Sequence, residues 1–423
     1  MKPKGPAERS GESGKGRSMG MHHRHFHLCI VAISVCTAIA DAASAGDFAR
    51  DRIGGKDDNH FDHGEGDMNL LPQQSSDQQN NSKSPYYPAV FIFGDSLSDV
   101  GNNNKLITLA KATRSPYGRD FPGGKPTGRF SNGLIGSDFL AEHIGLPTPP
   151  PYLSAGDNIL HGVCFASGSA GILNSSGSIA GQNLPLAKQV TYFANVKRAL
   201  QARLGEQGTK DLLRKSLFYF NVGSNDYVIN YFLTNGQVPS LLQEQYTPSQ
   251  FQDLLLSNLI FRIEELLAMG ARKVAVVGLS VLGCLPFQRL IRRADTCIES
   301  INDIVRAYNV ALLNCIRALQ AAHPDAVFTY LDGYRLADFI IRQPSAYGFE
   351  NVDSGCCGSG RFNGLQTCSV PGTYKVCKDA SKYLFWDSVH PTTEVDKLVI
   401  AKFWTGSYPD AIPYNLRELA LVS

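Results

Sequence analysis

Five short apolar runs alternate with long amphipathic stretches between Tyr86 and Tyr408, and this alternation restricts the chain to few folds. In the stretch 248–269, leucine and isoleucine recur every three or four residues, and Gly270 follows as a helix stop. Strands separated by helices of this length pair in parallel through crossovers. We therefore predict an α/β fold, a three-layer α/β/α sandwich whose mostly parallel central sheet has about five strands. The expected strands are 89–93, 162–165, 217–222, 273–278 and 327–331, and the expected helices are 133–144, 186–204, 248–269 and 300–323.

The segment before residue 85 differs from the rest of the chain. Residues 1–27 are basic, residues 28–40 are largely apolar, and Ala43-Ser44-Ala45 has the small residues of a cleavage site. This order is typical of a secretory signal peptide, and the apolar run is shorter than the ~20 residues of a transmembrane helix. We predict a signal peptide at 1–45, a disordered polar arm at 46–84 and one folded domain at 85–423. The protein is thus expected to be secreted and extracellular, with Met19 or Met21 as alternative start sites.

Cysteine usage agrees with export to an oxidising compartment. Two of the ten cysteines fall in the expected signal peptide. Two groups of cysteines are expected to form disulfides and not a zinc site, because paired C-x2-C spacing is absent, and their pairing is left open. Cys164 and Cys315 lie in apolar surroundings and are expected to pack in the core. The expected disulfide-forming cysteines are Cys284 and Cys297 around a short loop, and Cys356, Cys357, Cys368 and Cys377 near the C-terminus.

Neither the charge nor the histidines point to nucleic acid, a metal or a cofactor. The chain has 43% hydrophobic and 18% charged residues and a formal net charge of +2. His60 and His63 lie in an acidic tract in which solvated side chains are the expectation. The later histidines, His143, His161, His323 and His390, show no metal-ligand spacing. Asn80 and Asn174 lie in N-x-S sequons and are candidate glycosylation sites.

Polar residues follow three of the expected strands. Ser96 comes after the run Val-Phe-Ile-Phe-Gly-Asp, Gly168 and Gly171 lie in the stretch after 162–165, and Asn225 follows 217–222. The carboxyl ends of parallel strands meet at one edge of a sheet, where ligands bind. The sequence therefore predicts that these residues gather around one site.

A histidine and an aspartate near the C-terminus complete a set that acyl transfer needs. In the stretch WDSVHP, Asp387 precedes His390 by three residues. A serine hydroxyl is a poor nucleophile until a base takes its proton, and His390 is the candidate base for Ser96. Asp387 would orient the imidazole, and donors from the Ser96 N–H, a glycine N–H and the Asn225 amide would hold the oxyanion. The order Ser, Asp, His is that of α/β serine hydrolases, although G-x-S-x-G is absent at Ser96.

These motifs resemble those of plant-type GDSL esterase/lipases of the SGNH hydrolase superfamily. The shared stretches, in the family's order, are GDSLSDVGNN, SPYGRDFPGGKPTGRFSNG, GVCFASGSAG, VGSNDY, GCLP, CCGSG and WDSVHP. The resemblance covers the chain after Tyr86 and implies a flavodoxin-like sheet. It also implies Ser96, Asp387 and His390 as the catalytic triad, with Ser96, Asn225 and a glycine as oxyanion donors. Two residues depart from the family pattern: Cys164 replaces the usual asparagine, and Ser169 stands where many members have glycine. Gly168 is therefore the favoured donor, with Gly171 as the alternative.

The resemblance implies a secreted serine esterase that works through an acyl-enzyme without metal or cofactor. Its substrates would be small-molecule, lipid, cell-wall or phenolic esters. An acyltransferase using the same acyl-enzyme is the first alternative. An inactive wall-binding protein is the second, and the presence of every expected catalytic residue argues against it. The sequence does not choose among the esters, and it leaves the oligomeric state open.

Overall fold

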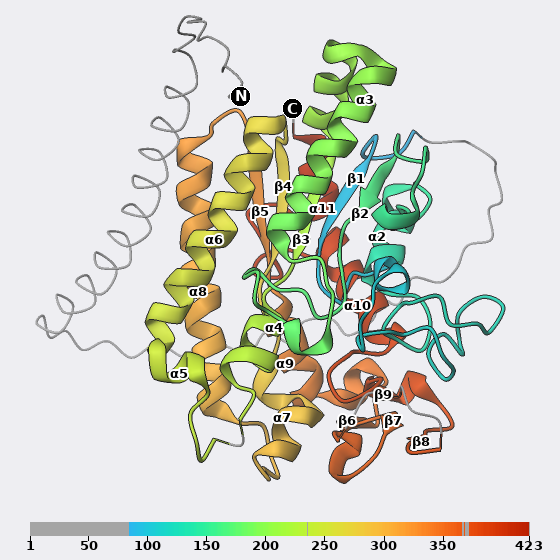
Figure 1. Cartoon of the computed structure of the whole chain (residues 1–423), viewed down its shortest axis with the longest axis vertical. Coiled ribbons are helices and arrows are strands. Elements are labelled where there is room, and N and C mark those ends of the chain that lie inside the picture. Colours follow the sequence, from blue (N-terminus) through green and yellow to red (C-terminus); the bar gives the residue numbers. More distant parts are fainter. Residues whose placement is uncertain (1–83, 235, 366–367, 369–371, 423) are drawn as a thin grey trace, which may run out of the picture.

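A central sheet with helices on both faces forms the main body of the protein (Figure 1). The computed structural model describes residues 84–234, 236–365, 368 and 372–422. The predicted signal peptide, the arm up to residue 83 and Asn80 lie outside the described residues. The strand order in the described sheet is β10-β5-β4-β3-β1-β2, and all neighbours pair in parallel except β10 with β5. The strands are β1 (Val90–Gly94), β2 (Gly162–Cys164), β3 (Leu217–Asn221), β4 (Lys273–Val277), β5 (Val327–Leu331) and β10 (Ala411–Ile412).

The predicted three-layer sandwich with a mostly parallel sheet is confirmed. Each of the five expected strands is present, with ends that differ by at most one residue. The parallel order β2-β1-β3-β4-β5 is the flavodoxin-like order, which places a topological switch point between β1 and β3. The antiparallel edge strand β10 was not expected, because two residues are too short to show a hydrophobic period.

Alternating side chains of the strands bury two different cores. On β1, Phe91 and Phe93 belong to one core with side chains of α3 (Leu186–Lys215), α6 (Pro248–Met269) and α8 (Glu299–Ala322). Val90 and Ile92 belong to the other core with side chains of α2 (Gly136–Ile144), α10 (Thr393–Thr405) and α11 (Leu416–Leu421). Both faces of the sheet are therefore buried from solvent, which explains why the sequences of its strands are continuous apolar runs. The long helices are α2 (Gly136–Ile144), α3 (Leu186–Lys215), α6 (Pro248–Met269), α8 (Glu299–Ala322), α9 (Gly333–Arg342) and α10 (Thr393–Thr405). The short helices are α4 (Ser224–Asp226), α5 (Leu241–Gln245), α7 (Pro286–Ile291) and α11 (Leu416–Leu421).

Helix boundaries follow local capping chemistry. Helix α6 has the predicted limits, because Thr247 and Gln250 form a capping box and Gly270 ends the helix in a left-handed conformation. Helix α3 was expected to end at Leu204. Gly205 does break it, with φ 72° and ψ 176°, but a second helical stretch then continues to Lys215. Among the described helices, none combines the length and apolar character needed to cross a membrane.

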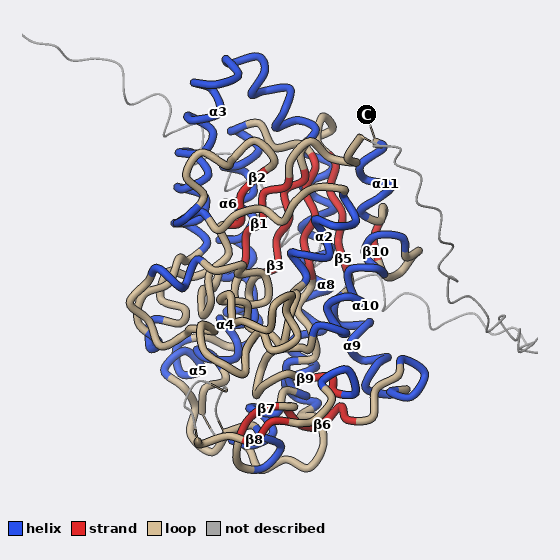
Figure 2. Tube along the Cα trace, turned by 90° about the vertical axis from the view of Figure 1, so that its right-hand side faces the viewer, coloured by secondary structure: helices blue, strands red, loops and turns tan. Residues whose placement is uncertain are grey.

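Three disulfides join cysteines of the described chain between residues 284 and 377. They join Cys284 to Cys297, Cys356 to Cys377, and Cys357 to Cys368. The expectation of disulfides from these six cysteines is confirmed, and Cys164 and Cys315 are buried as expected. The last two bridges lie around two small sheets apart from the main one (Figure 2). Their strands are β6 (Asn351–Gly355), β7 (Cys357–Gly358), β8 (Lys375–Val376) and β9 (Tyr383–Phe385).

The carboxyl end of β1 is fixed by a buried side chain of α3. The Gln189 amide accepts a hydrogen bond from the Gly94 N–H at 2.9 Å and donates to the Gly94 and Leu184 carbonyl oxygens at 2.8 and 2.7 Å. Gln189 is fully buried. Gly94 cannot be replaced at this point, because a Cβ atom would lie 2.6 Å from the Asn221 carbonyl oxygen.

We expect Gln189→Leu to lower the free energy of unfolding by about 3 kcal/mol, because it leaves the Gly94 N–H and the Leu184 carbonyl buried without a partner. Urea denaturation with the disulfides intact measures the change. Gln207→Leu on the exposed side of the same helix is the control and should change stability by about 0.5 kcal/mol or less. Equal effects of the two substitutions would contradict this account of Gln189.

Candidate active site

Ser96 lies in a tight turn directly beyond β1. The Ser98 N–H donates to the Asp95 carbonyl at 3.2 Å, and the Asp95 N–H donates to Asn221 on β3 at 3.2 Å. These bonds hold the turn against the carboxyl edge of the sheet, and Ser96 is only 8% exposed. The position is next to the switch point between β1 and β3, where parallel sheets of this order bind ligands.

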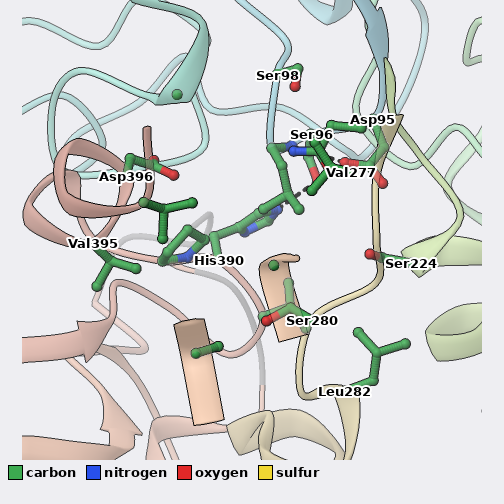
Figure 3. A pocket seen from close by; sticks show the side chains of 18 of the residues that line it. Asp95, Ser96, Ser98, Ser224, Val277, Ser280, Leu282, His390, Val395 and Asp396 are labelled. Carbon is green, nitrogen blue, oxygen red and sulfur yellow. Dashed lines mark hydrogen bonds between the residues drawn. The ribbon is translucent and has the colours of Figure 1, made fainter. Parts of the chain in front are cut away.

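His390 connects Ser96 to Asp387 through its two ring nitrogens. Its Nε2 lies 2.8 Å from Ser96 Oγ, a hydrogen bond drawn as a dashed line in Figure 3. Its Nδ1 lies 2.9 and 2.8 Å from the two Asp387 carboxylate oxygens. The backbone N–H groups of Val389 and His390 also donate to Asp387 Oδ1 at 2.9 Å. The three side chains thus form one hydrogen-bonded line, of the kind that lets an imidazole take a proton from a serine.

Asp387 is held ionised although it is fully buried. Burial alone raises the pKa of this carboxyl, but His390, Tyr117 and the Val389 N–H outweigh burial and bring the pKa below the ordinary aspartate value. The Tyr117 hydroxyl donates to Asp387 Oδ2 at 2.6 Å. The charged carboxylate is therefore available to stabilise a protonated imidazole.

Tyr117 comes from the segment 115–133, which also supports the imidazole and the start of α10. The Phe130 ring lies 5.0 Å from the His390 ring. The Ser131 hydroxyl donates to the Pro391 carbonyl at 3.0 Å, and the Asn132 side chain accepts from the Thr393 N–H at 2.9 Å. This segment is one of the stretches shared with the family, but the resemblance implied no role for its residues.

The buried carboxylate of Asp99 joins the turn after β1 to the loop after β2. It accepts hydrogen bonds from the backbone N–H groups of Gly101 and Asn102 at 2.7 and 2.6 Å, and from those of Asn103 and Gly168 at 3.2 and 3.1 Å. Burial nevertheless raises its pKa to about 6. The Gly168 N–H, which was the favoured glycine donor to the oxyanion, therefore already donates to Asp99 in this structure.

Gly171, the alternative donor, lies beside a different carboxylate. A Cβ atom on Gly171 would meet Asp226 Oδ2 at 2.5 Å. Asp226 accepts the N–H groups of Ile172 and Leu173 at 2.8 and 3.0 Å and the Ser176 hydroxyl at 2.6 Å. Neither Gly168 nor Gly171 is among the residues that line the pocket at Ser96.

The two departures from the family pattern have separate structural consequences. Ser169 adopts a left-handed conformation with φ 64°, which glycine adopts at lower cost. Cys164 is buried on the face of the sheet that packs against α2, and its Sγ lies 3.2 Å from the Ser98 carbonyl. Burial raises the pKa of this thiol to about 12, so it is neutral at physiological pH. Cys164 thus packs directly behind the turn that carries Ser96.

Asn225 and the Ser96 N–H are the remaining candidate donors beside the Ser96 hydroxyl. Asn225 lies in the turn after β3, and its amide donates to the Ala170 carbonyl at 2.9 Å with one of its two N–H bonds. The Ser96 N–H makes no hydrogen bond to the described part of the chain. Asn225, Ser96 and His390 line one pocket, whose cavity volume is about 170 Å³.

The pocket is bordered largely by apolar side chains, and Asp95, the residue before Ser96, is an unusual acid in its lining. Asp95 Oδ1 accepts the Leu97 N–H at 3.0 Å, whereas the buried Oδ2 has no hydrogen-bond partner among the described residues. Burial raises the Asp95 pKa to about 7. The apolar side chains come from the end of β4, from 281–285, from 384–389 and from α10.

The remaining described histidines serve packing and surface contacts. His143 stacks on Trp404 with ring centres 5.6 Å apart, His161 Nδ1 lies 3.2 Å from the Pro88 carbonyl, and His323 Nε2 lies 3.0 Å from Glu264. In residues that the structure describes, no group of three acidic, histidine or cysteine side chains is arranged to hold a metal.

Comparison with known proteins assigns the chain to a family. The model of the GDSL-like lipase/acylhydrolase family matches residues 90–403. The chain is 37% identical over 345 residues to GDSL esterase/lipase At5g08460 of Arabidopsis thaliana, with 79% of this chain and 88% of the relative covered. It is 40% identical over 343 residues to GDSL esterase/lipase At5g45670 of the same plant, with coverages of 79% and 93%. The chain therefore belongs to the GDSL-like lipase/acylhydrolase family and is a carboxylic-ester hydrolase.

Proposed function

We propose that Ser96, His390 and Asp387 are the catalytic triad of a secreted serine esterase. The observation that carries this proposal is the hydrogen-bonded line from Ser96 Oγ through both His390 nitrogens to Asp387, beside a pocket at the carboxyl end of the sheet. In the first step, Ser96 Oγ attacks the ester carbonyl while His390 Nε2 takes the serine proton. The imidazolium then gives this proton to the departing alcohol, which leaves the acyl group bonded to Ser96.

The second step releases the acid and restores the enzyme. Water loses a proton to His390 as its oxygen bonds to the acyl carbon, and Ser96 leaves with that proton. The tetrahedral intermediates carry an oxyanion, for which the Ser96 N–H and the second Asn225 N–H are the proposed donors. To act as a third donor, the Gly168 N–H would have to be shared between Asp99 and the oxyanion.

We propose that the enzyme is secreted and acts outside the cell. Residues 1–45 would be removed as a signal peptide, 46–84 would form a polar arm, and 85–423 would be the hydrolase domain. The three disulfides support an oxidising compartment. Asn174 is exposed and can receive a glycan. Sequencing of the amino terminus of the exported protein tests the cleavage site.

We expect a fluorophosphonate probe to label the wild-type protein and to fail with Ser96→Ala, because such probes react with serines activated by a base. Ester turnover should fall by at least ~10³-fold in the same variant. Ser280→Ala is the matched control, because Ser280 lines the same pocket and lies outside the proposed triad. Labelling that survives in Ser96→Ala, or is absent from folded wild type, would refute the proposal.

Tyr117→Phe should lower kcat/KM by about tenfold or more, because it removes a hydrogen bond to the ionised Asp387 without removing the ring. Steady-state kinetics with a short-chain ester measure this effect. Tyr374→Phe is the control, since the Tyr374 hydroxyl donates its hydrogen bond to the Ser115 carbonyl at 2.9 Å and not to Asp387. A Tyr117→Phe enzyme as active as Tyr374→Phe would show that this bond does not support catalysis.

Ester turnover should decline as the pH is lowered, because a protonated His390 cannot accept the Ser96 proton. The pKa of Asp387 is lowered, so its carboxylate stays ionised down to pH values below about 3.9, the ordinary aspartate value. The loss should therefore occur well before Asp387 is neutralised. A kcat/KM profile between about pH 4 and 8 measures it, and a rate that stays constant down to pH 4 would argue against a histidine base.

A further inference from the structure

The pocket at Ser96 extends along α10, which begins three residues after His390. Asp396, Val399, Ile400 and Phe403 recur at helical spacing and all line the pocket. From Asp396 to Phe403 the helix advances by about 10 Å. Ile400 and Phe403 belong to the buried core, so the pocket is closed on this side. An enclosed space suits the acyl group, which stays bonded to Ser96 after the alcohol has left.

One carboxyl interrupts this apolar wall. Figure 3 shows the Asp396 side chain turned from α10 toward the pocket. The wall also includes Tyr219 of β3 and Val277 of β4. The described residues provide no ion-pair partner for Asp396. Arg129 is bound instead to Asp138, with both contacts at 2.7 Å.

The surroundings of Asp396 favour its neutral form. Burial raises its pKa well above the ordinary value, and the charge of Asp138 adds to this effect, whereas the Gly136 N–H opposes it. A neutral carboxyl can both donate and accept a hydrogen bond. The Tyr219 hydroxyl is a second polar group of the same wall, and its own pKa is raised by burial and by Asp396. A hydrocarbon chain alone would offer these polar groups no further hydrogen bond when it displaced water from the pocket.

We propose that this part of the pocket holds the acyl chain of the ester and that Asp396 hydrogen-bonds an oxygen substituent on that chain, so that hydroxylated acyl groups are preferred over plain hydrocarbon ones. The inference rests on the proposed function, since it takes Ser96 as the residue that carries the acyl group. Asp396 is a specificity residue in this scheme and takes no part in proton transfer.

The test compares two p-nitrophenyl esters of equal chain length, one with a hydroxyl on the acyl chain and one without. The full chain, expressed through a secretory route, should hydrolyse the hydroxylated ester with a kcat/KM about three to ten times higher. Asp396→Leu should reverse the preference, because it removes the hydrogen-bonding group and adds apolar surface. Asp396→Asn should keep the preference, because its amide can still bond the hydroxyl. Glu394→Leu, an exposed acid on the same turn of α10, should leave the ratio unchanged.

A p-nitrophenyl acetate assay separates the two levels of inference, because an acetyl group is too short to extend along α10. If acetate is hydrolysed and Asp396→Leu leaves the ratio between the long esters unchanged, the role of Asp396 is overturned. If wild type fails on acetate, the proposed triad fails first. In that case, thermal-shift titration with the free hydroxylated and plain acids tests the role of Asp396 without requiring ester turnover. Stronger stabilisation by the hydroxylated acid, lost in Asp396→Leu but kept in Asp396→Asn, supports the role of Asp396, and equal stabilisation overturns it.

Discussion

The geometry of the turn that carries Ser96 depends on the hydrogen bonds of the fully buried Asp99 carboxylate. Chain segments that leave a parallel sheet must satisfy their backbone N–H groups without a neighbouring strand. Asp99 does this for four N–H groups, three from its own turn and that of Gly168 in the loop after β2. Asn102 adds bonds from its amide to the Cys164 and Ala166 carbonyls at 2.9 Å. The two loops therefore form one polar unit behind Ser96, and Asp226 joins the turn after β3 to the same unit.

The His390 imidazole is held by loops other than those that form this polar unit. His390 lies between β9 and α10, and the segment 115–133 supports it through Tyr117, Phe130 and Ser131. The serine is thus fixed by the sheet edge and the histidine by the loops that cover it. Buried groups make the contacts on both sides and hold His390 Nε2 at 2.8 Å from Ser96 Oγ.

Much of the fold was predictable because its signals are local. Continuous apolar runs predicted the five parallel strands, and the three- and four-residue period of leucine and isoleucine, followed by Gly270, predicted helix α6 with its limits. The signals failed where elements are short or held by distant partners. Strand β10 has two residues, and the small sheets β6–β9 and β7–β8 depend on disulfides and long-range pairing. For the site, Ser96, Asn225 and His390 were expected together and line one pocket, whereas the two candidate glycines lie outside it.

By itself, the sequence determined the alternation of strands and helices, the family, and the residue types able to perform acyl transfer. These follow from hydrophobic period and from short motifs, which require only neighbouring residues. Only the tertiary structure decided which of these groups contact one another. It engaged the Gly168 N–H with Asp99, brought the Tyr117 hydroxyl to a carboxylate 270 positions away, and placed Asp396 in an apolar pocket with Ser96. Such pairings arise from packing between segments far apart in the chain, and no local pattern of residues encodes them.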